Sequence, residues 1–103
     1  MSTRTTDAQV QAVRALVSSI PPGRVCTYGD IACAAGLSSA RIVGWIMATD
    51  SADLPWHRVI SASGRPARHL ADRQLALLRA EGVSDRDGRV AITGAESVRH
   101  ALR

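Results

Sequence analysis

The side chains best suited to chemistry are concentrated in one short stretch, Leu54-Pro55-Trp56-His57-Arg58-Val59-Ile60. An imidazole such as that of His57 acts as a general base when a nucleophile lies beside it. The neighbouring Trp56 offers none, because its ring nitrogen is a donor without a nucleophilic lone pair. We therefore assign no catalytic residue and expect His57 to be a hydrogen-bonded structural group. Taken alone, the stretch is equally compatible with an aromatic-bearing loop packed in a core.

The composition favours a folded domain with an anionic partner. The chain has 103 residues, of which 46% are hydrophobic and 21% charged, so we expect one folded domain over residues 1–103 rather than disorder. The formal net charge is +4, and all 13 basic residues are arginine, which suits phosphates and base edges. Abundant alanine and arginine also fit a GC-rich genome, so the charge alone is weak support for nucleic acid.

Neither a membrane segment nor a metal site is expected. No apolar run approaches the length of a membrane span, and Met1-Ser2-Thr3-Arg4 leads into a polar mixture rather than a signal peptide. We expect a cytoplasmic protein that associates with the nucleoid when bound to DNA. Cys26 and Cys33 lack the spacing of metal ligands, which predicts two buried thiols, no metal and no cofactor.

Helical periodicity dominates the first half of the chain. Apolar residues at helical spacing, preceded by capping residues at Thr6-Asp7, Thr27 and Ser38-Ser39, predict three helices. These helices span Asp7–Ser19, Tyr28–Ala35 and Ser39–Ala48.

The second and third of these helices have the spacing of a helix-turn-helix. Ala32 is small, Gly36 follows four residues later in the turn, and Ile42 is β-branched six residues beyond. Two short helices cross closely when the contact residue is small and the turn adopts a positive φ. A structural helical hairpin is the alternative interpretation. In either case we expect Trp45, on the third helix, to be a core residue.

The second half contains shorter elements around one more helix. The pattern predicts an extended segment over His57–Ile60, a turn at Ser63-Gly64 and a basic loop from Arg65 to His69. Asp72 is the expected cap of a fourth helix that carries Leu75, Leu77 and Leu78 and ends at Glu81-Gly82. The final expected elements are a turn at Asp87-Gly88, an edge strand over Arg89–Ile92 and a frayed helix over Glu96–Arg103, whose tail begins near Gly94.

Several blocks in order resemble one family over about Asp7–Val83. The stretch around Trp56 is similar to the Pro-Cys-His-Arg-Val loop of the DNA O6-alkylguanine alkyltransferases, with tryptophan in place of the alkyl-accepting cysteine. The chain thus resembles the alkyltransferase-like proteins, which lack that cysteine. The resemblance implies a mainly α fold with a winged-helix-like helix-turn-helix, similar to the C-terminal domain of the alkyltransferases. The matching blocks are Ile20–Val25, Thr27–Ala32, Ala40–Gly44, Pro55–Ile60 and Ala80–Val83.

The resemblance also implies a function without catalysis. Such a protein binds double-stranded DNA through the minor groove and rotates an O6-alkylguanine out of the helix into a pocket. It holds the base without repairing it, and so marks the lesion for the proteins of nucleotide excision repair. Because nothing resembles a dimerisation helix, we expect a monomer.

The resemblance assigns the DNA-contacting residues. Tyr28 matches the tyrosine that crowds the target phosphate and helps to rotate the nucleotide. Arg41 matches the arginine finger that fills the space left by the flipped base, and a planar guanidinium suits that role because it stacks and donates hydrogen bonds. Ser38 and Ser39, at the start of the same helix, belong to this DNA-contacting set.

The resemblance assigns the pocket as well. Trp56 occupies the alkyl-acceptor position beside Pro55, and His57 and Arg58 match the residues that follow the lost cysteine. Glu81 matches the glutamate that orients the histidine in active enzymes, so we expect it to support the pocket.

An arginine of the basic loop is expected against the flipped base. We favour Arg68 for this contact, while Arg65 and His69 remain open because the loop is shorter than in some relatives. Simple phosphate binding is the alternative role for these side chains.

Two other functions remain open on the sequence. A transcriptional regulator would use the helix-turn-helix to read base edges in the major groove, as a dimer on a palindromic site. An active enzyme would transfer the alkyl group to Cys26 or Cys33. Neither cysteine has a sequence context that lowers a thiol pKa, which disfavours the enzyme.

Overall fold

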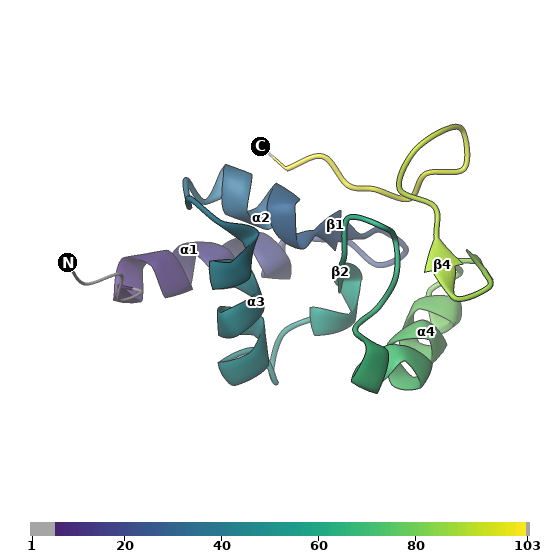
Figure 1. Ribbon diagram of the computed structural model, residues 1–103, viewed down its shortest axis with the longest axis horizontal. Coiled ribbons are helices and arrows are strands. Elements are labelled where there is room, and N and C mark those ends of the chain that lie inside the picture. Colours follow the sequence, from purple (N-terminus) through teal and green to yellow (C-terminus); the bar gives the residue numbers. More distant parts are fainter. Residues whose placement is uncertain (1–5, 103) are drawn as a thin grey trace.

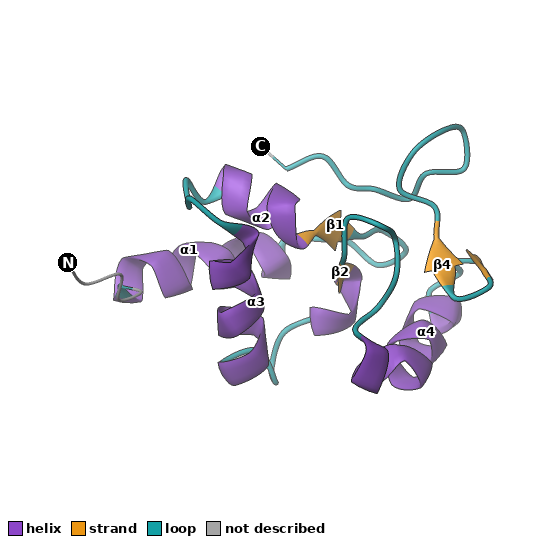
Figure 2. Ribbon diagram, viewed as in Figure 1, coloured by secondary structure: helices purple, strands orange, loops and turns teal. Residues whose placement is uncertain are grey.

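The computed structural model describes residues 6–102, which form a mainly α fold with short strands (Figures 1 and 2). Within these residues, no helix is long and apolar enough to cross a bilayer. The segment Met1-Ser2-Thr3-Arg4 and the final residue Arg103 lie outside the described residues. The elements are α1 (Asp7–Ser18), β1 (Cys26–Thr27), α2 (Tyr28–Ala34), α3 (Ala40–Thr49), the 3-10 turn η1 (Trp56–Arg58), β2 (Val59–Ile60), the 3-10 turn η2 (Arg68–Leu70), α4 (Ala71–Ala80), β3 (Asp85–Arg86) and β4 (Arg89–Val90).

The first three helices begin at the predicted capping residues. The side chain of Thr6 accepts a hydrogen bond from the Gln9 backbone, and the Gln9 side chain accepts one from Thr6. Thr27 and Asp30 form the same reciprocal pair at α2. Ser39 caps α3 through its hydroxyl oxygen. Each cap satisfies backbone donors that the helix itself leaves free, which fixes where the helix starts.

Helices α2 and α3 form the helix-turn-helix. Gly36 has a φ of +71° at the end of α2, and the Leu37 amide donates to the Ala32 carbonyl oxygen at 2.8 Å. Ala32 is buried, so the two helices pack closely. Val43 and Ile46 of α3 complete the contact within a core that also includes residues of α1. The predicted helix-turn-helix geometry is confirmed.

A pair of parallel strands, β1 and β2, places the stretch from Leu54 to Ile60 beside α2. Cys26 of β1 pairs with Val59 of β2, and Thr27 pairs with Ile60. The predicted extended segment over His57–Ile60 is only half right, because residues 56–58 form the 3-10 turn η1. In a strand, successive side chains point to opposite faces, so His57 and Arg58 would point away from each other. The 3-10 turn instead lets both side chains reach Glu81.

A second core lies beneath α4. It contains Leu75 and Leu78 from the helix, together with Ile60, Val83 and Val90. The helix begins at Ala71, so the expected cap at Asp72 is wrong, and the preceding Leu70 makes no side-chain capping bond. Asp72 instead lies in the first turn, where its negative charge interacts favourably with the helix dipole.

The last residues form an extended segment rather than the expected helix over Glu96–Arg103. The Val25 amide donates to the Val98 carbonyl oxygen, and the His100 amide donates to the Val25 carbonyl oxygen. Arg99 donates two hydrogen bonds to the Asp30 carboxylate, at 2.9 and 2.5 Å. Residues 98–100 thus pair beside β1, and this pairing uses the backbone groups that a helix would have satisfied internally.

Two predictions about burial are wrong. Cys26 is buried, and burial raises the pKa of its thiol to about 11, but Cys33 is exposed. Trp45 is 57% exposed rather than a core residue. Helix α3 turns Val43 and Ile46 inward, and a residue between them in sequence points away from that face.

The turn at Gly64 packs against β4, because the Val90 amide donates a hydrogen bond to the Gly64 carbonyl oxygen at 2.8 Å. Gly64 has a φ of +79°, and a Cβ at this position would lie 2.2 Å from the Val90 carbonyl oxygen. We expect Gly64→Ala to lower the free energy of unfolding by at least about 2 kcal/mol, because backbone strain and the clash add. Chemical denaturation measures this effect. In the control Gly94→Ala, φ is +80° with open space around the Cβ, so the cost is smaller, and equal costs would contradict the clash.

Candidate nucleotide-binding pocket

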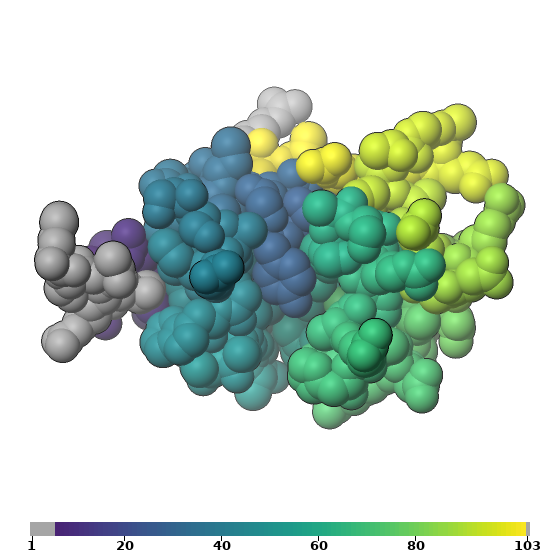
Figure 3. Space-filling model, viewed as in Figure 1, coloured from purple at the N-terminus to yellow at the C-terminus, as the bar shows by residue number. Residues whose placement is uncertain are grey.

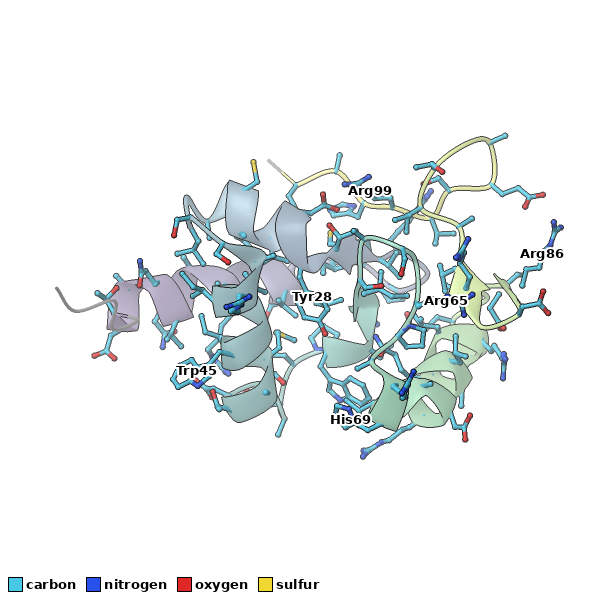
Figure 4. All side chains as sticks on the ribbon, in the orientation of Figure 1. Tyr28, Trp45, Arg65, His69, Arg86 and Arg99 are labelled. Atoms are coloured by element: carbon cyan, nitrogen blue, oxygen red, sulfur yellow. The ribbon has the colours of Figure 1, made fainter. Side chains whose placement is uncertain are left out.

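A pocket of about 580 Å³ lies between the C-terminal half of α3 and the start of α4. The space-filling view shows the face hollowed between the teal atoms of α3 and the green atoms of the segment that leads into α4 (Figure 3). In the view with side chains, Tyr28 and His69 lie on the side of α3 that faces this hollow (Figure 4). The lining includes Tyr28, Gly44, Ala48, Trp56, His69 and Arg73.

Trp56 forms the aromatic wall of this pocket. The indole is half-buried at the start of η1, and the His57 ring lies edge-on to it with 6.2 Å between centroids. The guanidinium carbon of Arg73 lies 5.6 Å from the centroid of the indole ring. A cation over an aromatic face is attracted by the ring quadrupole. The pocket therefore presents a flat apolar surface with a positive charge beside it.

Tyr28 is the second aromatic residue of the pocket. It is the first residue of α2, so the cap at Thr27 fixes its backbone. Burial raises the pKa of its phenol above the ordinary value, because a buried phenolate would lose its hydration. The hydroxyl is neutral near pH 7, and it both donates and accepts hydrogen bonds.

Glu81 gathers a polar network behind the pocket. Its carboxylate accepts hydrogen bonds from His57 Nε2 at 2.7 Å, from Arg58 Nη2 at 2.6 Å and from the Gly23 amide at 3.0 Å. Arg58 Nη1 also donates to the Ile20 carbonyl oxygen. The Arg58 guanidinium is the largest cause of the low pKa of Glu81, about 2, and His57 and Gly23 lower it further. Glu81 is thus ionised and holds η1 in place.

Gln74 fixes the same turn from α4. Its side chain is buried, and Nε2 donates to the carbonyl oxygens of His57, at 3.0 Å, and Val59, at 2.8 Å. A buried amide that satisfies two backbone acceptors orients the segment between them. The sequence reasoning missed Gln74, although its position one turn before the apolar Leu78 was an available signal.

The structure places the predicted site residues in different parts of the molecule. Trp56, Tyr28 and His69 come together at the pocket, whereas Pro55, His57 and Arg58 do not line it. Arg65 and Arg68 are exposed and outside the lining, and Arg73, which the sequence reasoning missed, takes a place within it. The exposed residues Ser38, Ser39 and Arg41 lie at the start of α3.

The family described as the 6-O-methylguanine DNA methyltransferase DNA-binding domain matches residues 8–83. The chain belongs to this family. The matched residues include the helix-turn-helix, the pocket and Glu81. The match ends before β3, so the β3–β4 hairpin and the extended C-terminal segment follow it.

The relatives of this family member include proteins named for base flipping. The chain is 42% identical over 82 residues to a DNA base-flipping protein of Escherichia coli, covering 75% of this chain and 64% of that relative. It is 42% identical over 74 residues to alkyltransferase-like protein 1 of Schizosaccharomyces pombe, covering 65% of this chain and 68% of the relative. The chain therefore spans less than two thirds of the Escherichia coli relative.

Solved structures of the family have the same fold. The Schizosaccharomyces pombe protein Atl1, in complex with damaged DNA containing O6-carboxymethylguanine, matches with a TM-score of 0.71 and 36% identity, over 79% of this chain and 82% of that one. The Mycobacterium tuberculosis O6-methylguanine methyltransferase in complex with DNA matches with a TM-score of 0.64 and 37% identity, over 76% and 51%. The recognition of an alkyltransferase-like protein and its mainly α fold are confirmed.

Proposed function

We propose that this protein binds duplex DNA containing O6-alkylguanine and holds the flipped base in the pocket between α3 and α4 without transferring the alkyl group. The pocket, with Trp56 as an aromatic wall and Arg73 over its face, carries the proposal. Relatives named for base flipping and for complexes with damaged DNA support it.

The chemistry of the lining suits a flipped purine. A base stacks on an indole whatever its sequence context, and a guanidinium interacts with a π-face through cation-π contact. Arg73 covers the indole, so a base that stacks there displaces the guanidinium, which then lies beside the base in the same lining as His69. We therefore assign this role to Arg73 in preference to Arg68 or Arg65.

The residues that line the pocket do not include the thiol that accepts the alkyl group in the enzymes. We assign the alkyl-acceptor position of the enzymes to Trp56, whose indole has no nucleophilic lone pair. No cysteine lines the pocket within the described residues. The Cys26 thiol is buried with a raised pKa, so little thiolate forms near neutral pH. His57 donates to Glu81, which makes it a structural group rather than a poised base.

The exposed start of α3 supplies the groups for nucleotide flipping. Extruding a nucleotide costs a few kcal/mol of stacking and pairing, and less when alkylation has weakened the pair. Arg41 is exposed at the second position of α3 and is free to enter the base stack. Tyr28 lies at the pocket, where it crowds the target phosphate. Ser38 and Ser39 are exposed beside Arg41 and belong to the same proposed DNA-contacting surface. The captured lesion then marks the DNA for nucleotide excision repair by a monomeric, nucleoid-associated protein.

Arg41→Ala is expected to weaken binding to duplex DNA about tenfold while leaving the fold intact, because it removes the group that fills the vacated stack. The measurement is fluorescence anisotropy of a labelled duplex, with circular dichroism as the test of folding. Arg86→Ala is the matched control, since Arg86 is an exposed arginine on the β3–β4 side of the molecule, away from α3 (Figure 4). Equal affinities of Arg41→Ala and the unaltered protein would remove the finger role.

One titration separates the three functions considered above. Matched duplexes with and without O6-methylguanine are titrated at several salt concentrations, and intact-protein mass is measured in the same samples. We expect tighter binding to the modified duplex, weaker binding of both duplexes at higher salt, and an unchanged protein mass. A mass increase would establish alkyl transfer, and binding to the modified duplex no tighter than to the unmodified one would contradict the proposal and favour a protein that reads undamaged DNA, such as a transcriptional regulator.

A further inference from the structure

Trp45 is a large aromatic side chain that lies outside the hydrophobic core. It is 57% exposed, whereas the apolar residues on either side of its position, Val43 and Ile46, are fully buried. Trp45 and Leu77 are the exposed large hydrophobic residues among residues 6–102, and Leu77, on α4, is 37% exposed. Tryptophan is common at binding interfaces, where one part of the ring contacts the partner and the part with the N–H remains solvated.

The exposed face of α3 connects Trp45 to the proposed flipping residue. At 3.6 residues per turn, Trp45 lies about one turn after Arg41 on the same face of the helix. Gly44 and Ala48 lie beside this face and line the pocket. Figure 4 shows Trp45 extending from α3 on the side opposite Tyr28. DNA that receives Arg41 therefore meets the face of α3 that carries Trp45, on the side away from the pocket.

The charge around Trp45 favours a polyanion. Helix α3 contains no acidic residue, and Arg41 provides a positive charge one turn away. The nearest acidic residues along the chain, Asp50 and Asp53, both pair with Arg14. One arginine against two aspartates leaves a net charge of −1 at that cluster, so the positive charge that favours phosphates beside the indole is that of Arg41.

We propose that Trp45 is a DNA-contacting residue, whose indole packs against the wall of the groove that receives Arg41. This inference rests on the proposed function, because it takes the direction of the DNA from Arg41 and the pocket. Proteins that enter the minor groove use apolar side chains as wedges against base steps and sugars. The indole N–H is a hydrogen-bond donor, and bases and phosphates offer acceptors for it. Because Trp45 lies outside the pocket lining, it adds affinity without recognising the lesion.

Trp45→Ala is expected to weaken binding about tenfold for duplexes with and without O6-methylguanine alike, so that the ratio of the two dissociation constants stays unchanged. Trp45→Phe keeps an aromatic ring and retains most of the affinity. Leu77→Ala is the matched control, an exposed apolar residue on another helix, with unchanged binding. Circular dichroism verifies each fold. Binding by Trp45→Ala as tight as that of the unaltered protein would overturn the proposal.

Fluorescence gives a second readout, because the chain has two tryptophans. Trp56→Phe leaves Trp45 as the emitter, and anisotropy establishes the duplex concentration that saturates this variant. Saturating duplex is expected to protect Trp45 from quenching by acrylamide. Saturated DNA binding with undiminished quenching would overturn the contact and leave the proposed function standing. Absence of DNA binding by the unaltered protein would overturn both. Protection by a protein fraction but not by duplex would instead assign the surface to a protein partner and overturn the contact.

Discussion

Replacing Glu81 with glutamine is expected to lower the free energy of unfolding at pH 7 by about 3 kcal/mol, since the pKa of Glu81 lies at about 2 in the fold against an ordinary value of 4.5. The carboxylate accepts hydrogen bonds from Arg58 and His57, and both of these side chains are largely buried. The amide keeps the shape of the side chain but removes the charge, which leaves the Arg58 cation without its counter-ion.

The sign of the pH dependence follows from the lowered pKa. An ionised Glu81 stabilises the fold fully above its ordinary pKa of 4.5, and this stabilisation is lost as the pH falls toward about 2. The difference in stability between the unaltered protein and Glu81→Gln should therefore be largest at neutral pH and should shrink below about pH 4.5. Urea denaturation of both proteins at pH 7 and pH 3 measures it.

The matched control for Glu81 is an exposed glutamate. Glu96 is exposed and has no ion pair among residues 6–102, so Glu96→Gln should change stability little at either pH. Equal stability of Glu81→Gln and the unaltered protein at pH 7 would show that the network of Glu81, Arg58 and His57 does not stabilise the fold.

Trp56→Ala is expected to reduce the preference for O6-methylguanine over guanine at least tenfold, because it removes the aromatic wall on which we propose that the flipped base stacks. The same change leaves Arg73 without the ring that its guanidinium faces. Affinity for unmodified duplex should change much less, because the DNA contacts proposed for Arg41 and Trp45 lie outside the pocket. Anisotropy titrations with the two matched duplexes give both numbers.

Trp56→Phe separates stacking from a general loss of structure. Phenylalanine keeps an aromatic face in the 3-10 turn η1, so most of the preference for the modified base should remain. If Trp56→Ala kept the full preference while the protein stayed folded, recognition of the lesion would have to come from His69, Arg73 or Tyr28 alone, and the proposed wall would be wrong.

The local pattern of the sequence determined the helices and their junction. Thr6, Thr27 and Ser39 cap helices because hydroxyl oxygens satisfy backbone donors within a few residues, and such contacts are encoded locally. Gly36 ends α2 with a positive φ for the same local reason. The ordered blocks around Tyr28, Arg41 and Trp56 were also sufficient to recognise the family. The roles of those three residues in binding remain predictions.

Contacts between distant segments decided the rest. The sequence gives no direct sign that Arg73 faces Trp56 or that Gln74 holds the backbone of His57, because these pairs meet only when α4 packs against η1. The C-terminal residues favour a helix locally, yet pairing of Val98 and His100 with Val25 draws them into an extended segment. Trp45 fits a core by its type, but its place on α3 relative to Val43 and Ile46 turns it outward. Burial and long-range pairing depend on where elements meet, and a local pattern does not specify that.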